Sequence, residues 1–152
     1  RHAMEPIDQR SDARSLFIAA TPAEVFAALS DPARVARWWG PDGFSSTIHR
    51  FEFQAGGAWL LTMHGPDGTD YPNESRFTRL VAGELFEIEH LSGHHFVLSI
   101  ELHPSGHGTE VRWRQTFDTV EHYDRIAGFL AGANQQNLER LRAEVLRAAD
   151  SA

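Results

Sequence analysis

The sequence predicts an α+β protein in which one curved antiparallel sheet is covered by a single long C-terminal helix. Between Phe44 and Phe117, apolar runs of roughly six to ten residues alternate with glycine-containing turn clusters, a rhythm typical of an antiparallel meander. From Asp118 to Ala149, apolar residues instead recur every three or four positions along a broad stripe, which indicates a helix. At ~1.5 Å per residue this helix extends about 40 Å, long enough to cross the sheet.

The chain before the meander predicts a short strand and two short helices. Residues 15–20 have the apolar character of a strand. Residues 21–24, Thr-Pro-Ala-Glu, then have the form of a capping box with proline at the first helical position. A second cap followed by proline, at residues 30–32, starts another helix that ends at the Gly-Pro pair of residues 40–41.

Period-two alternation within the meander predicts one covered face and one solvent face. The inward positions of successive strands are apolar, whereas the alternating positions are mostly charged, as at Glu87, Glu101 and Arg112. The strand around residues 73–81 fits this pattern poorly. Phe77 and Leu80 cannot both point inward unless that strand contains a bulge.

This architecture predicts a hollow between the helix and the sheet. A helix is only ~10–12 Å across, so a single one cannot fill the concave side of a sheet that curls around it. Gly128, Gly132 and Ala133 lie on or near the covering stretch of the helix, where small side chains would leave further space. The alternative, that these small residues let the helix pack closely on the sheet, stays open.

The length of 152 residues suits one domain, which we place at residues 13–149 after a polar segment, residues 1–12, that we expect to be flexible. The chain contains no Cys, and all 14 of its basic residues are Arg. The missing Cys excludes disulfides, thiolate nucleophiles and Cys-based metal sites. The missing Lys excludes Schiff-base chemistry.

Charge and hydropathy limit the partners. A net charge of −7 argues against nucleic acid, whose phosphates require a basic face. No apolar run approaches the ~18–20 residues of a membrane span, and no signal-peptide pattern opens the chain. We therefore expect a cytoplasmic protein with no nucleic-acid partner and no membrane span. Whether it forms a homodimer stays open.

The hollow is the candidate binding site, and its expected ligand is a small, largely hydrophobic molecule. Large apolar side chains on the covered face of the sheet and on the helix are expected to form its walls. These are Phe51, Trp59, Leu61, Met63, Phe77, Ile88, Phe96, Leu98, Trp113, Phe129 and Leu130.

Three polar residues are expected to orient the polar end of the ligand: His90, Gln115 and Asn137. His90 continues an inward apolar set, so it is a candidate hydrogen-bonding group or general base, or alternatively a buried histidine satisfied by the backbone. Gln115 needs a partner, because an unpaired buried amide costs roughly 1–3 kcal/mol. Asn134 and Asn137 on the helix are the candidates, and Asn137 is favoured because it lies on the apolar stripe. A purely internal polar network stays open as the alternative to a ligand-binding role.

Trp38 and Trp39 are placed at the rim of the cavity, one ring in the core and the other at the mouth, with plain core packing of both as the alternative. A metal site would have to come from the histidines around positions 64, 90, 94 and 95. His94 and His95 are adjacent on a strand and point to opposite faces, so they do not easily share one ion. We expect no metal and no cofactor.

Several motifs, taken in order, resemble one family. They are residues 20–26 (Ala-Thr-Pro-Ala-Glu-Val-Phe), 30–32, 38–41 (Trp-Trp-Gly-Pro), 56–59 (Gly-Gly-Ala-Trp), 65–68, 89–90 with 92–93, and 108–109. Their order and spacing over roughly residues 12–146 resemble the SRPBCC superfamily of START/Bet v 1-like proteins. The most similar branch is the bacterial one related to the C-terminal domain of the Hsp90 ATPase activator Aha1. The resemblance implies a helix-grip fold, with two short helices between the first two strands and a long C-terminal helix over a hydrophobic cavity.

The resemblance leaves three functions open, because one fold hosts many activities. Members of the superfamily bind lipids, hormones and other small apolar molecules, which suits a ligand-binding function. Others act as aromatase/cyclases on polyketides, so a cyclase or dehydratase with His90 or an inward carboxylate as its acid/base is the second hypothesis. The Aha1-type domain contacts a chaperone, which makes an Hsp90-interacting module the third.

Overall fold

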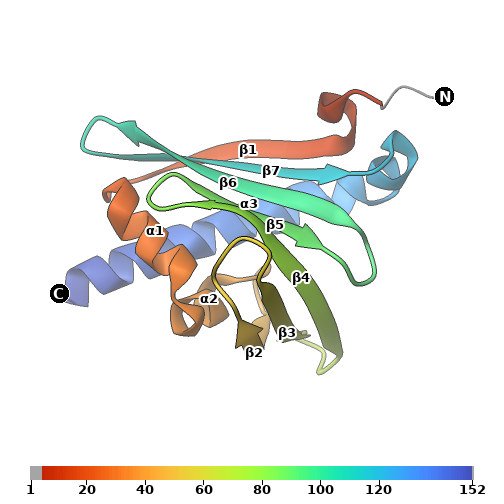
Figure 1. Cartoon of the computed structure of the whole chain (residues 1–152), viewed down its shortest axis with the longest axis horizontal. Coiled ribbons are helices and arrows are strands. Elements are labelled where there is room, and N and C mark those ends of the chain that lie inside the picture. Colours follow the sequence, from red (N-terminus) through yellow and green to blue (C-terminus); the bar gives the residue numbers. More distant parts are fainter. Residues whose placement is uncertain (1–4, 152) are drawn as a thin grey trace.

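The computed structural model describes residues 5–151 and confirms the α+β helix-grip architecture. Seven strands form one antiparallel sheet in the order β1-β7-β6-β5-β4-β3-β2, and three α-helices accompany it (Figure 1). The elements are η1 (Ile7–Arg10), β1 (Ser11–Ile18), α1 (Pro22–Ser30), α2 (Pro32–Trp38), β2 (Ser45–Phe51), β3 (Ala58–His64), β4 (Asp70–Val81), β5 (Leu85–His90), β6 (Phe96–Ser105), β7 (Gly108–Phe117) and α3 (Val120–Ser151).

The start of the chain corrects the expectation of a flexible segment over residues 1–12. Residues 1–4 lie outside the described part, but β1 already begins at Ser11, which pairs with Thr116 of β7. The side chain of Arg10 is buried, and its Nη1 donates a hydrogen bond to the Phe117 carbonyl at 2.7 Å. The polarity of the stretch predicted flexibility, but Arg10 and Ser11 bind the neighbouring strand β7, at the Phe117 carbonyl and the Thr116 hydroxyl.

The two short helices start as their caps predicted. Thr21 Oγ1 accepts from the Glu24 N–H, and Glu24 Oε1 accepts from the Thr21 N–H, which completes the capping box of α1. Asp31 Oδ1 accepts from the Ala33 N–H at the start of α2. Trp38 Nε1 donates to the Ala28 carbonyl at 2.9 Å and so ties the end of α2 back onto α1.

The strand around residues 73–81, whose inward face the alternation left open, contains a bulge. The register between β4 and β5 shifts between Phe77 and Arg79, which adds one residue to β4. As a result Phe77 is fully buried and Leu80 packs against the core.

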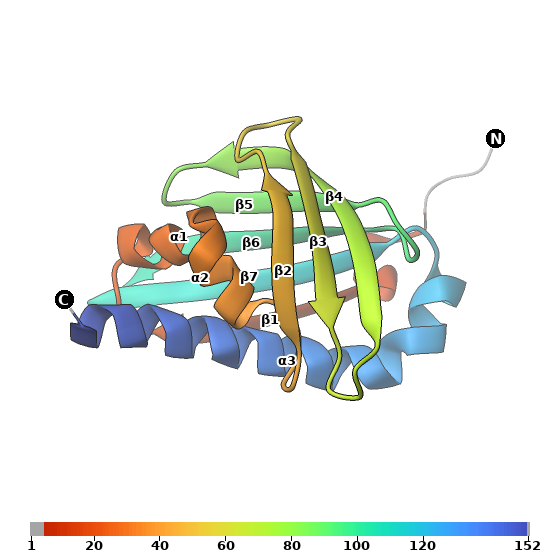
Figure 2. The same cartoon turned by 90° about the horizontal axis from the view of Figure 1, so that it is seen from below.

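The sheet curls strongly around α3. Figure 2 shows β7 and β6 running roughly along the axis of α3, while β2, β3 and β4 run across it. Helices α1 and α2 lie beside the C-terminal half of α3 and close that end of the sheet. No helix in the part of the chain that the structure describes is long and apolar enough to cross a membrane.

An ionic cluster around the buried carboxylate of Glu144 joins α2 to α3. The Glu144 carboxylate receives hydrogen bonds at 2.9 Å from Nε of Arg34 and from Nε of Arg37. Arg147 binds the same group from one turn further along α3. Burial alone raises the pKa of Glu144, but the hydrogen bonds from Arg147, Arg37 and Arg34 outweigh it and lower the pKa to about 2.

Candidate functional site

A pocket of about 360 Å³ lies between the N-terminal half of α3 and the concave face of the sheet. Strands β3 to β7 provide its floor and far wall, the connection from α2 to β2 closes one end, and α3 forms the near wall. Its lining is mostly apolar, with a few amide and imidazole side chains among the apolar ones. The lining residues are Trp39, Gly40, Pro41, Phe44, Met63, Tyr71, Asn73, His90, His94, Phe96, Leu98, Trp113, Gln115, Phe117, Ile126, Phe129, Leu130, Asn134 and Asn137.

Gly40 shapes the end of the pocket where the chain leaves α2. Its φ of +95° is strained for any residue with a side chain, and a Cβ atom there would come within 2.8 Å of Met63 Cε. The turn is held from α3. Asn137 Oδ1 accepts from the Gly40 N–H at 3.1 Å, and Asn137 Nδ2 donates to the Trp38 carbonyl at 2.8 Å. One oxygen and one N–H of the Asn137 amide are therefore committed to the backbone of this corner.

A chain of polar side chains reaches the floor of the pocket from β1. Asp12 lies opposite Gln115 in the β1–β7 register, and Arg14 binds its carboxylate through two hydrogen bonds of 2.8 Å. Asn134 Nδ2 donates both to Asp12 Oδ2 at 3.0 Å and to Gln115 Oε1 at 2.9 Å. Burial raises the pKa of Asp12, but the hydrogen bonds from Arg14 and Asn134 prevail and leave it lowered, so this carboxylate is ionised at neutral pH.

The partner of Gln115 is therefore Asn134, and the preference for Asn137 was wrong. Asn137 is buried, as its place on the apolar stripe of α3 predicts. Its amide, however, binds the connection between α2 and β2 and does not reach Gln115. Asn134, one turn earlier, lies over β1 and β7. Asp12 is the residue that could have pointed to Asn134, because its carboxylate accepts a hydrogen bond from the Asn134 amide. It lies in the segment 1–12, whose polarity predicts flexibility.

His90 lies at the opposite side of the pocket, and each of its ring nitrogens already faces an oxygen atom. Nδ1 lies 2.6 Å from the His94 carbonyl oxygen and Nε2 lies 2.5 Å from Asn73 Oδ1, and a neutral ring can donate to only one of these two oxygens. Its ring stacks on Phe96 with the centroids 4.5 Å apart. Burial lowers the pKa of His90. Next to it, His94 Nδ1 meets His122 Nε2 of α3 at 2.7 Å.

The structure divides the predicted wall residues into two groups. Met63, Phe96, Leu98, Trp113, Phe129 and Leu130 line the pocket, as do His90, Gln115 and Asn137. Phe51, Trp59, Leu61, Phe77 and Ile88 do not; apart from the half-buried Phe51 they are buried, and all five belong to the solid core beneath α1 and α2.

An aromatic cluster explains why that second group encloses no space. Trp59 stacks on Phe77 with the ring centroids 5.9 Å apart, and Trp39 covers Trp59 at 4.7 Å. The two candidate rim residues separate in the same way. Trp38 is fully buried in the core, whereas the neighbouring Trp39 lines the pocket.

Several lining residues were not predicted from the sequence. Ile126 lies on the apolar stripe of the helix and Phe117 continues the inward set of its strand, so both carried a usable signal. Phe44 and Tyr71, whose rings lie 6.1 Å apart, belong to a loop and to a strand end, where period-two alternation does not determine direction.

Gly128 and Gly132 do not create the pocket. Both are exposed, and a Cβ atom on either would meet nothing within 4 Å. Neither the predicted extra space nor close packing therefore depends on them. The hollow arises because no second helix lies under this half of α3.

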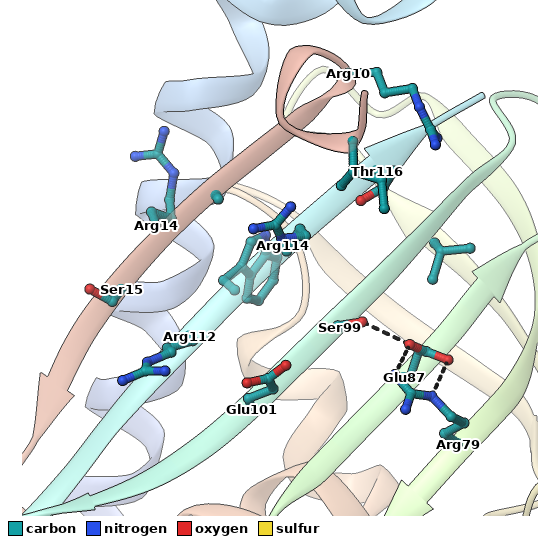
Figure 3. Close-up of a pocket in the computed structure, with 14 residues that line it drawn as sticks. Arg10, Arg14, Ser15, Arg79, Glu87, Ser99, Glu101, Arg112, Arg114 and Thr116 are labelled. Atoms are coloured by element: carbon teal, nitrogen blue, oxygen red, sulfur yellow. Dashed lines mark hydrogen bonds and ion pairs between the residues drawn. The ribbon is translucent and has the colours of Figure 1, made fainter. Parts of the chain in front are cut away.

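A larger hollow of about 750 Å³ lies on the outer face of the sheet, over β1, β7, β6 and β5, and has a different character (Figure 3). Half of its lining residues are charged, and several of them form ion pairs. Glu87 receives hydrogen bonds from Arg79 at 2.8 Å and from Ser99 at 2.9 Å, and Arg114 pairs with Asp8 at 3.2 Å. A hollow with so many charged side chains suits polar contacts rather than an apolar ligand.

Within residues 5–151, no group of three or more His, Asp or Glu side chains is arranged to hold a metal ion. His95, the most highly connected of the histidines, is bound by carboxylates instead. Its Nε2 contacts Glu89 at 2.7 Å and its Nδ1 contacts Asp118 at 2.9 Å.

Comparison with known proteins agrees with this architecture. The family model described as "Activator of Hsp90 ATPase homolog 1-like protein" matches residues 19–145. The chain belongs to the AHSA1 family. The match runs from the end of β1 to the last turns of α3, so it includes all three helices and every lining residue of the pocket. No curated protein sequence is significantly similar to this AHSA1 chain.

Solved structures share the fold at low sequence identity. A solution structure from Arthrobacter aurescens is 23% identical, with a TM-score of 0.84 over 94% of this chain and 90% of that one. A crystal structure from Nitrosomonas europaea is 17% identical, with a TM-score of 0.84 over 95% and 99%. An AHSA1-like protein from Aeromonas hydrophila is 22% identical, with a TM-score of 0.72 over 91% and 94%. At these identities the likeness shows the fold alone.

Proposed function

We propose that this protein binds a small, largely hydrophobic molecule in the pocket between α3 and the sheet. The observation that carries the proposal is the pocket itself, about 360 Å³ of space lined mainly by apolar side chains with a few polar groups at its edges. At ~30 Å³ for each water-sized group, this space holds about a dozen non-hydrogen atoms. A two-ring aromatic molecule has this size.

Apolar burial would provide most of the affinity. A ligand that buries about 200 Å² of apolar surface gains roughly 5 kcal/mol at ~25 cal/mol per Å². Leu98, Trp113 and Leu130 are buried and shape the inner part of the pocket. Phe129 is 70% exposed and lies at its outer edge, so a ligand that enters would cover it.

The test is titration with naphthalene by isothermal calorimetry, together with a variant that fills the pocket. Ile126 is half-buried and lines the pocket, so Ile126→Trp places a large ring in the space without cutting into the core. We expect this change to weaken naphthalene binding at least tenfold. Arg125→Trp, at the exposed neighbouring position, is the control and should leave the affinity unchanged. Absence of naphthalene binding, or equal binding by both variants, would refute the proposal.

The cyclase or dehydratase hypothesis has less support from the geometry. Among the described residues that line the pocket, none is Asp or Glu, and both ring nitrogens of His90 are engaged. An acid/base pair aimed at one bound carbon skeleton would require a second titratable group.

The family description favours a second candidate function, contact with an Hsp90-type chaperone. The mixed-charge hollow over Arg79, Arg112 and Arg114 is the surface that suits such a contact. An ATPase assay of an Hsp90-type protein with and without this chain tests it. Stimulation that is lost in Arg112→Glu but kept in Ile126→Trp would separate chaperone contact from ligand binding.

A further inference from the structure

We infer that the pocket selects ligands whose polar end is a neutral group that both donates and accepts hydrogen bonds, such as a hydroxyl, and that it discriminates against carboxylates. This inference rests on the proposed ligand-binding function and names the chemistry of its polar end. It is carried by two amide side chains on the pocket floor, Gln115 and Asn134.

The orientation of these two amides is determined by their neighbours. The Asp12 carboxylate can only accept hydrogen bonds, so the Asn134 atom that contacts it at 3.0 Å must be the NH₂ group. The same NH₂ group contacts Gln115 at 2.9 Å, so that contact must be made by the Gln115 carbonyl oxygen. Arg14, bound to Asp12 through two hydrogen bonds, keeps the carboxylate in place.

One hydrogen-bond donor on Gln115 and one acceptor on Asn134 are then left without a partner within residues 5–151. No described residue accepts a hydrogen bond from Gln115 Nε2 or donates one to Asn134 Oδ1. The two residues are only 8% and 6% exposed, and both line the pocket. Trp113, two positions from Gln115 on the same face of β7, adds a buried Nε1 donor with no partner among the described residues. Neither amide atom is among the fully buried unpartnered atoms of the described part of the chain, so both are open to the pocket, where a polar group of a ligand can pair with them.

A hydroxyl satisfies this arrangement in one step. Its oxygen accepts from Gln115 Nε2, and its hydrogen is donated to Asn134 Oδ1. A carboxylate oxygen can accept from Gln115 but has no hydrogen for Asn134 Oδ1, and the two oxygens would repel each other. No Arg or Lys lines the pocket within the described residues, so a buried anion would also lack a cation.

The histidine side of the pocket does not offset this preference. His90 on β5 lies two strands away from Gln115 on β7, about 10 Å by strand spacing. Both of its ring nitrogens already face oxygen atoms of His94 and Asn73. A ligand with its polar end on the Gln115–Asn134 pair therefore places its apolar body between Phe96 and α3.

The experiment compares four ligands of one shape at pH 7 by calorimetry: naphthalene, 2-methoxynaphthalene, 2-naphthol and 2-naphthoate. We expect 2-naphthol to bind about tenfold tighter than naphthalene, since one donor and one acceptor gain partners. The methyl ether accepts but cannot donate, so it should fall between them. Naphthoate should bind more weakly than naphthalene.

A variant assigns the effect to the amide pair. Gln115→Met keeps the length of the side chain and removes its donor, so 2-naphthol should lose its advantage and bind within about twofold of naphthalene. Both ligands are measured on the same variant, so the ratio of the two affinities is the readout, and far-UV circular dichroism with thermal denaturation shows that the variant folds. Gln54→Met, the same substitution in an exposed turn, is the control and should leave all four affinities unchanged.

The outcomes separate the two proposals. If none of the four molecules binds, the ligand-binding function fails and the inference fails with it. If naphthalene binds but 2-naphthol is no tighter, or naphthoate binds most tightly, only the inference fails. It is equally overturned if Gln115→Met retains the advantage of 2-naphthol, because the hydroxyl then lies elsewhere.

Discussion

The two halves of α3 face the same sheet but meet very different surroundings. In the C-terminal half, Leu138 and Leu141 are completely buried, and α1 and α2 pack against this part of the helix. In the N-terminal half, Ile126 is half-buried and Phe129 is 70% exposed, with the pocket beneath them. One continuous helix thus forms part of a solid core at one end and one wall of a hollow at the other.

The difference comes from the number of layers and not from the helix sequence. Both halves carry apolar residues at helical spacing. Where α1 and α2 add a second layer, the space inside the curl is filled. Where they end, a helix ~10–12 Å wide leaves part of the concavity open. A pocket in this fold is therefore a property of where the two short helices stop.

Truncating one leucine in each half of α3 tests this difference in packing and has the largest expected effect. Leu141→Ala should lower the free energy of unfolding by about 3 kcal/mol, because it opens a new cavity in a packed core. Leu130→Ala should lower it by only about 1 kcal/mol, because Leu130 already borders open space. Urea denaturation of both variants measures the two values. Equal losses would mean that the two halves are packed alike.

The ionic cluster of the solid half should make stability depend on pH. The pKa of Glu144 is lowered from 4.5 to about 2 in the folded protein, so its stabilising effect is complete above about pH 4.5. It is lost as the pH falls from there toward 2, and amounts to about 3 kcal/mol.

Glu144→Gln isolates this effect from the other carboxylates. The variant should be less stable at pH 7, and the difference in unfolding free energy from the wild type should shrink as the pH falls through the same window. Asp150→Gln, an exposed acidic position near the end of α3, is the control and should show a difference near zero at every pH. A constant gap between Glu144→Gln and the wild type would contradict the assignment.

The smallest expected effect comes from replacing Gly132, one of the two glycines in the N-terminal half of α3. A methyl group at Gly132 meets nothing within 4 Å, and the residue is exposed in the middle of a helix. Gly132→Ala should therefore raise stability by about 0.5–1 kcal/mol through helix propensity alone. Thermal denaturation measures the gain, and naphthalene affinity should stay the same. A loss of stability would show that the helix needs glycine there to approach another element.

Several elements followed from local patterns. The capping box at Thr21 and the second cap at Asp31 occur where the sequence predicted them, and the bulge between Phe77 and Arg79 lies in the strand that did not fit simple alternation. Each depends on residues within a few positions of one another or within one strand pair. The antiparallel meander and the single long helix followed for the same reason, whereas the pairing of β1 with β7 joins strands about a hundred residues apart.

Only part of the pocket lining could be predicted from the sequence. Period-two alternation correctly predicted that Leu98, Trp113 and Gln115 point inward, but it could not show which inward residues border empty space. Trp59 and Phe77 also point inward, yet they stack on each other in the core. Whether an inward ring lines a pocket or fills a core depends on what packs over it, and that layer comes from a distant part of the chain.

Local chemistry along the chain was thus sufficient for the kind of each element and its order along the chain, because caps, turns and periodicity act between near neighbours. It misplaced the first strand, expected at residues 15–20 and found at Ser11–Ile18. Packing in three dimensions settled where the hollow lies and which atoms remain free inside it. Asp12 orients Asn134 across 122 positions, and Asn134 in turn orients Gln115. Contacts of that range arise only once the sheet has curled around the helix, so they leave no periodic trace in the sequence.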